Sequence, residues 1–215
     1  MRRILQVAVV AATLIGAAAY AGIAGSKHDL SLNFAGFNPA GSAPTNEICR
    51  PCHTPHNANG NLVPLWNHTT TTQTFIPYTS TTMTGGTAGV PTGGSLACMS
   101  CHDGITAVDA FGGSTTGGHA MAGASTANLG LDLSNDHPIG FSYQASVAAD
   151  PGIIAPATPG VCVTLAGTTC ETPLYGATGN MECATCHAVH GSGVIPKFLR
   201  VNNAGSALCL KCHNK

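Results

Sequence analysis

The sequence repeats one five-residue pattern four times: two cysteines separated by two residues, with a histidine directly after the second. This C-x-x-C-H pattern is the attachment signature of c-type haem, in which both thiols form thioethers with the haem and the histidine ligates the iron. Histidine is only 10 of 215 residues, so its presence after all four pairs is not a chance result. The sequence therefore predicts four covalent haems. Numbered first to fourth along the chain, the motifs supply the predicted thioether cysteines Cys49 and Cys52, Cys98 and Cys101, Cys183 and Cys186, and Cys209 and Cys212, with proximal histidines His53, His102, His187 and His213.

Two other uses of paired cysteines were weighed against haem attachment. Zinc also binds C-x-x-C pairs, and the third and fourth motifs come nearest to a zinc spacing, with 22 residues between Cys186 and Cys209. Zinc does not explain a histidine after every pair, nor the 45 residues between Cys52 and Cys98. A thioredoxin-like redox site needs one such motif in a βαβ pattern. The pattern therefore favours haem.

The N-terminus has the features of a secretory signal peptide. Arg2 and Arg3 precede an almost unbroken apolar run from Ile4 to Ala19, and Ala19-Tyr20-Ala21 is a small-x-small cleavage signal. We expect cleavage after residue 21 and a mature chain over 22–215 with no membrane span. An uncleaved anchor is the alternative, although the run is short for a spanning helix. The predicted location is secreted, at the cell surface or extracellular, with the periplasm as the alternative.

Two further cysteines, Cys162 and Cys170, lie outside the motifs and are not followed by histidine. In an oxidising compartment, they are expected to form a disulfide that closes a small loop. Two free thiols or a degenerate haem site are the alternatives.

The composition is unusual for a globular domain. Only 11 residues are aromatic (one Trp, four Tyr and six Phe) and 8% are charged, whereas Gly and Pro number 27 and 13. Stretches such as 69–94 and 112–128 show no helical or strand periodicity and cannot bury enough side-chain area to offset chain entropy. Haems are large apolar plates that can replace a conventional core. We therefore expect mostly irregular coil with short α-helices wrapped around four haems, and little β structure.

The order of the motifs suggests a duplicated two-haem unit. The first and third motifs continue to a further histidine, reading C-x-x-C-H-x-x-H, and the second and fourth do not. We expect one domain, with haem doublets over about 28–110 and 181–215 and a disulfide-containing loop region over about 111–180. Helix is expected at each motif and over 204–212, and short strands over 75–78 and 161–165.

The second ligand of each iron decides its chemistry, because an open position permits catalysis and a second histidine favours electron transfer. Ten histidines less the four proximal ones leave six candidates for four irons, a surplus that argues against an open site. Met83 and Met121 are alternative ligands. The favoured second ligands are His28, His56, His137 and His190, with His68 and His119 as alternates.

His56 and His190 each lie three residues after a proximal histidine. Three residues span at most about 10 Å, which is too short to reach the opposite face of the same haem. Each is therefore expected to ligate a different haem, which would bring two haems close together. The alternative is a surface histidine.

These motifs resemble the doubled C-x-x-C-H multihaem cytochromes c and, more narrowly, the small tetrahaem outer-surface cytochromes of metal-reducing bacteria that form conductive filaments (OmcE type). The resemblance implies bis-histidine haems stacked in alternating parallel and T-shaped pairs. It also implies that one subunit donates a histidine to a haem of the next, and His56 is the best match to that donor. The segments that carry the resemblance are Lys27–Ser31, Cys49–Asn57, Pro64–His68, Asn135–Pro138 and the two C-terminal motifs.

The function expected from these features is electron transfer, with the chain as the subunit of an extracellular conductive filament. The expected partners are further copies of the chain, joined head to tail, other redox cytochromes and extracellular electron acceptors. A monomeric periplasmic shuttle and, less favoured, a multihaem reductase are the alternatives. No substrate site is visible in the sequence, so we do not expect an enzyme.

The charge of the chain does not suggest a nucleic-acid partner. Without Arg2 and Arg3 the chain has six basic and nine acidic residues, a net charge of −3, and it contains no basic patch that would bind nucleic acid.

Overall fold

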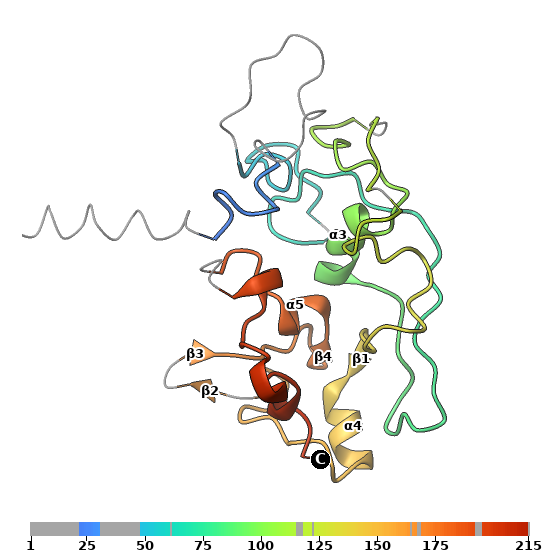
Figure 1. The fold of residues 1–215 in the computed structure, drawn as a ribbon, viewed down its shortest axis with the longest axis vertical. Helices are drawn as coiled ribbons and strands as arrows, with labels where there is room; N and C mark the ends of the chain where they lie inside the picture. Colours follow the sequence, from blue (N-terminus) through green and yellow to red (C-terminus); the bar gives the residue numbers. More distant parts are fainter. Residues whose placement is uncertain are drawn as a thin grey trace, which may run out of the picture.

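The computed structural model describes residues 22–30, 48–60, 62–114, 118–121, 123–163, 165–166, 169–191 and 195–214. The expected signal peptide, residues 1–21, lies outside this part of the chain. Regular secondary structure is sparse in the described residues (Figure 1). The helices are α3 (Gly93–His102), α4 (Tyr143–Ala149), α5 (Cys183–Cys186) and the 3-10 helices η2 (Pro196–Phe198), η3 (Ala204–Ser206) and η4 (Cys209–Lys211); the strands are β1 (Phe141–Ser142), β2 (Leu165–Ala166), β3 (Thr169–Cys170) and β4 (Asn180–Met181).

The strands form two separate two-stranded antiparallel sheets, β1 with β4 and β2 with β3. In the first sheet Phe141 pairs with Met181, which joins the segment before α4 to the segment before α5. In the second sheet Leu165 pairs with Cys170. None of the helices in the described ranges is long and apolar enough to cross a membrane.

The local predictions for strands and the last helix differ in detail from the structure. Segment 75–78 contributes an isolated bridge from Ile76 to Asp132 in place of a strand. In segment 161–165 the strand β2 begins only at Leu165. The expected helix over 204–212 is divided into η3 and η4, because Gly205 and Ser206 adopt left-handed backbone conformations with φ of 61° and 62°.

Helices α3 and α5 lie side by side near the middle of the molecule (Figure 1) and carry the second and third motifs. The buried face of α3 is built mainly from small residues, including Ser95 and Ala97, which allow close approach. Glu182 caps α5 through a capping box with Thr185. The buried carboxylate of Glu182 also accepts hydrogen bonds from the hydroxyls of Ser95 and Thr92. This contact joins the two helices.

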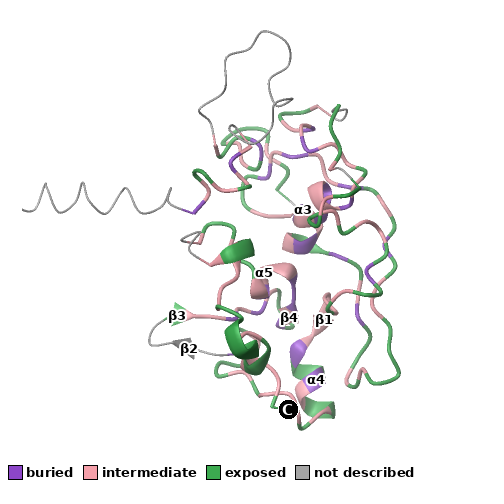
Figure 2. Cartoon of the chain, viewed as in Figure 1, coloured by how far each residue is buried: buried purple, intermediate pink, exposed green. Residues whose placement is uncertain are grey.

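Among the described residues, apolar burial is divided between two small clusters. Tyr143, Val163, Leu174 and Met181 form one cluster, and Phe75, Met99 and Leu133 form the other. Figure 2 shows buried residues as short separated segments between intermediate and exposed ones. Wrapping of the chain around haems remains a prediction.

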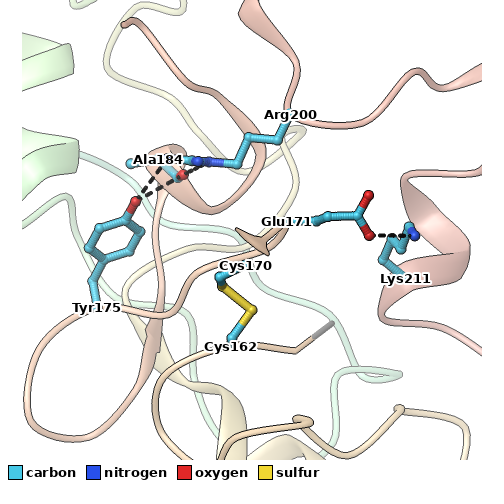
Figure 3. The surroundings of a disulfide bond; sticks show 7 residues. All are labelled: Cys162, Cys170, Glu171, Tyr175, Ala184, Arg200 and Lys211. Carbon is cyan, nitrogen blue, oxygen red and sulfur yellow. Dashed lines mark hydrogen bonds and ion pairs between the residues drawn. A yellow bond between two sulfur atoms is a disulfide. The ribbon is translucent and has the colours of Figure 1, made fainter. Parts of the chain in front are cut away.

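The structure contains a disulfide between Cys162 and Cys170, with their Cα atoms 5.9 Å apart (Figure 3). It closes the loop that carries the β2–β3 hairpin. Beside it, Glu171 forms an ion pair of 2.7 Å with Lys211, which lies within the fourth motif. The disulfide loop is therefore attached to the last motif.

Candidate functional site

Each C-x-x-C-H motif folds as a helical turn. The histidine N–H donates to the carbonyl oxygen of the first cysteine at 2.8 Å in the first motif, 3.1 Å in the third and 2.9 Å in the fourth. The second motif forms the last turn of α3. Residues three and four apart lie on the same face of a helix, so each turn brings two thiols and an imidazole to one side. This is the arrangement that a covalently attached haem needs.

His53, His102 and His187 each have their ring nitrogen Nδ1 beside a backbone carbonyl oxygen. Donation from Nδ1 leaves Nε2 with a free lone pair, the form in which imidazole binds a metal. The motif turn and this second hydrogen bond together orient each ring. The acceptors are Pro64 for His53 at 2.9 Å, Ala127 for His102 at 2.7 Å and Lys197 for His187 at 2.8 Å.

The first and second motifs are neighbours, because the N–H of Asn67 donates to the carbonyl oxygen of Cys52 and the next side chain, His68, lies 3.5 Å from the sulfur of Cys101. Burial raises the pKa of the Cys101 thiol, and electrostatic interaction with Cys52 raises it further. Because Cys52 belongs to the first motif and Cys101 to the second, the two attachment sites lie within interaction range.

The second and third motifs are in closer contact. The thiols of Cys98 and Cys183 share a hydrogen bond, which raises the pKa of Cys98 and lowers that of Cys183 to about 7. The third and fourth motifs are also neighbours, since burial and then electrostatic interaction with Cys212 raise the pKa of Cys186 to about 11. The four motifs thus follow one another in space in their sequence order.

Three motif histidines each face a second histidine ring. Two imidazoles that bind one metal from opposite sides, through bonds of about 2.0 Å, have ring centroids about 6.3 Å apart. The observed separations lie close to this value. The pairs are His53 with His190 at 5.8 Å, His28 with His102 at 6.1 Å and His137 with His213 at 6.4 Å.

His28 is held in the neutral state that metal binding requires. Burial lowers its pKa to about 4, and the neighbouring rings of His102 and His187 contribute to the shift. Its ring also stacks on Phe198, with centroids 4.7 Å apart. His28 therefore lies between the second and third motifs.

His56 and His190 follow their motifs at the same spacing, but they have different surroundings in the structure. The ring of His190 packs against His53 of the first motif. His56 is exposed, and the hydroxyl of Thr54 donates a hydrogen bond of 3.0 Å to its backbone carbonyl. In the described residues, His56 faces no motif histidine at this separation.

The two alternate candidates have different surroundings. His68 is buried, with Nε2 3.5 Å from the sulfur of Cys101 and Nδ1 2.8 Å from the carbonyl oxygen of Thr69. His119 is exposed and lies 3.2 Å from the carboxylate of Asp109. Hydrogen bonds from the His119 loop outweigh partial burial and lower the pKa of Asp109.

The third motif differs from the other three. Over the ranges that the structure describes, His187 has no second histidine ring at the separation seen in the three pairs. In these ranges no group of three or more His, Cys, Asp or Glu side chains could hold a metal ion.

Several residues beside the motifs were not identified from the sequence. Arg200 donates from Nε to the carbonyl oxygen of Ala184 at 2.7 Å, inside the third motif, and from Nη2 to the hydroxyl of Tyr175 at 3.2 Å (Figure 3). Glu182 and Phe198 were missed as well. These residues form no local sequence motif. Charged residues are only 8% of the chain, and this scarcity could have drawn attention to Arg200 and Glu182.

Comparison with known proteins gives one family match. Residues 176–215 match the doubled CXXCH motif family, which covers the third and fourth motifs. A search of curated proteins found no match. The CXXCH motifs imply covalently bound c-type haem. The match supports a multihaem c-type cytochrome and indicates a function in electron transfer.

Proposed function

We propose that the chain binds one haem at each of its four motifs and conducts electrons along them in sequence order. The observation that carries the proposal is the succession of neighbouring cysteines, from Cys52 and Cys101 through Cys98 and Cys183 to Cys186 and Cys212. Thioethers at these positions would place successive haems next to one another along the series of motifs.

The protein residues have three tasks in this proposal. The cysteines tether each haem, and the motif histidines bind from one face with Nε2. The backbone carbonyls at Pro64, Ala127 and Lys197 fix the ring orientation. A haem with two histidine ligands supplies an iron that gains and loses one electron with both axial positions filled. Ligand exchange is then not needed for function.

The ring pairs support an assignment of the second ligands. His190 serves the first motif, His28 the second and His137 the fourth. For the third motif we infer that the ligand is His56 of a neighbouring subunit. Its exposure and the lack of a partner for its ring in the described residues support this assignment.

We further propose that the subunits assemble head to tail into an extracellular conductive filament. The first motif lies near one end of the molecule, and the fourth lies beside α4 at the other (Figure 1). A contact that brings the first-motif end of one subunit to the third motif of the next joins different surfaces of identical subunits, so it does not need to close and can extend as a filament. The chain is then a secreted electron carrier rather than an enzyme, and its other partners are redox cytochromes and extracellular electron acceptors. A monomeric periplasmic shuttle is the alternative.

Electron microscopy of the secreted protein tests the assembly. The wild-type chain should form filaments, whereas His56→Ala should give four-haem monomers in which one haem of four binds carbon monoxide. His119→Ala, which removes another exposed histidine, is the matched control and should leave the filaments intact. Long filaments of the His56→Ala variant with every haem low-spin would refute the assignment of His56. Wild-type protein that is monomeric at high concentration would favour the shuttle.

A further inference from the structure

Phe198 makes a close planar contact with one of the paired histidines. Its ring lies parallel to that of His28, with centroids 4.7 Å apart and an interplanar angle of 12°. Phe198 belongs to η2, next to the third motif, whereas His28 pairs with His102 of the second motif. The stack therefore joins a ligand of one motif to the backbone of another.

The backbone that carries Phe198 is strained. Lys197 and Phe198 are consecutive non-glycine residues in the left-handed region, with φ of 59° and 56°. Bulky side chains rarely adopt this conformation, and where they do, the surrounding structure must determine it. Such residues concentrate at functional sites.

Hydrogen bonds to the third motif hold this strained turn in place. The carbonyl oxygen of Lys197 lies 2.8 Å from Nδ1 of His187, and that of Phe198 accepts from the N–H of Ala188 at 2.8 Å. Just beyond the turn, the N–H of Arg200 donates to the carbonyl oxygen of Cys186 at 2.8 Å. The same two residues thus orient the motif histidine His187 and place an aromatic ring against His28.

The backbone around His28 has its own attachments. The N–H of His28 donates to the hydroxyl of Ser26 at 3.1 Å, and the buried carboxylate of Asp29 accepts from the N–H of Gly25 at 2.8 Å. A pocket of about 280 Å³ is lined by residues of both this segment and η2, including Lys27 and Phe198. These hydrogen bonds attach the His28 backbone without involving Phe198, whereas the Phe198 ring contacts the His28 ring itself.

We propose that Phe198 is a positioning residue that fixes the rotation of the His28 ring about its bond to iron. The inference rests on the proposed haem ligation by His28 and His102. The contact keeps these two rings far from parallel, at 68°. The relative orientation of two axial imidazoles sets the splitting of the iron d orbitals, and with it the electron paramagnetic resonance (EPR) spectrum and the reduction potential of that haem.

Low-temperature EPR of the oxidised four-haem protein tests this role. Near-perpendicular rings give a low-spin signal with a large maximum g value, and near-parallel rings give a rhombic signal. Phe198→Ala should shift one large-g signal toward the rhombic type or broaden it, and should shift the potential of one haem. Phe198→Tyr should keep the wild-type spectrum, because tyrosine retains the flat ring. Phe111→Ala, which removes a half-buried ring that lies near Arg50, is the control and should leave the spectrum unchanged.

Two further measurements separate the ways in which the inference can fail. Phe198→Leu keeps apolar bulk without the flat ring, so it should show the same spectral shift even if Phe198→Ala loses ligation by His28. A wild-type spectrum in Phe198→Leu would overturn the positioning role. If the wild-type protein itself shows no low-spin signal from paired histidines, the proposed ligation fails, and the inference about Phe198 fails with it.

Discussion

His190 packs against His53 with ring centroids 5.8 Å apart, although His190 follows the third motif and His53 ends the first. One histidine of the second doublet thus lies beside the first motif of the other doublet. In the proposed ligation, this pair would join the two halves of the chain through a metal bond, so neither doublet is expected to reach its full ligation alone.

Replacing His190 tests this pairing directly. His190→Ala should leave four haems attached but open one axial position, so that one haem of four binds carbon monoxide in the reduced protein. His190→Met should keep that haem six-coordinate and raise its potential, because a thioether ligand favours the reduced iron. Absorption and magnetic circular dichroism spectra provide the measurement. If the His190→Ala variant does not bind carbon monoxide, another residue is the second ligand of the haem at the first motif.

The cysteines predict both the mass and the thiol content of the mature protein. Eight cysteines in thioethers and two in the Cys162–Cys170 disulfide leave none of the ten free. Intact mass under denaturing conditions should exceed that of the polypeptide by four haems, and thiol titration should find no reactive thiol. A shortfall of one haem, accompanied by two new thiols, would show that one motif is not used.

The angles between paired rings predict the EPR spectrum of the wild-type protein. The His28–His102 and His137–His213 pairs have interplanar angles of 68° and 70°, whereas His53–His190 has 33°. Two haems should therefore give large-g low-spin signals and one a more rhombic signal. Four identical rhombic signals would contradict the ring geometry.

The buried carboxyl of Glu182 predicts a pH-dependent stability. Burial raises its pKa above the ordinary value of 4.5, while hydrogen bonds from Ser95 and Thr92 oppose the shift. A carboxyl whose pKa is higher in the folded than in the unfolded state stabilises the fold fully at pH values below its unfolded-state pKa. This contribution is lost as pH rises through the folded-state pKa. Between the unfolded-state and folded-state pKa of Glu182, the stability of the wild-type protein should therefore fall with rising pH more steeply than that of Glu182→Gln, as measured by thermal unfolding.

Removing the Glu182 side chain altogether should be more damaging than neutralising it. Glu182→Ala leaves the buried hydroxyl of Ser95 without its acceptor and removes the cap of α5, at a cost of about 1–3 kcal/mol. Denaturant unfolding at pH 7 gives the comparison. Equal stability of the Ala and Gln variants would show that this contact does not hold α3 against α5.

The disulfide should contribute to stability without affecting haem attachment. The two cysteines, Cys162 and Cys170, are 8 residues apart in the sequence. Replacing both with serine removes the constraint on this loop, and the loop-closure entropy predicts that the free energy of unfolding falls by about 2.5 kcal/mol. Denaturant unfolding measures the loss, and intact mass should still show four haems. Loss of a haem in this variant would mean that the loop is needed to form the fourth motif, to which Glu171 and Lys211 connect it.

The C-x-x-C-H motifs are local features, and so the sequence alone was sufficient to predict haem attachment at them. Both thiols and the proximal histidine lie within five residues, and a single helical turn brings them to one face whatever the rest of the chain does. The Cys162–Cys170 pairing is similarly short in range. The exclusion of His56 and His190 from the neighbouring haem follows from chain length alone.

Which distant groups meet was decided only by the tertiary structure. His56 and His190 share the same local pattern, yet only His190 lies against a motif histidine among the described residues, because packing between the doublets selects the partner. The role of Phe198 depends on a left-handed backbone that its residue type disfavours and that hydrogen bonds to the third motif maintain. Short-range spacing determines what each motif can bind, whereas long-range contacts determine how the bound groups are paired and oriented.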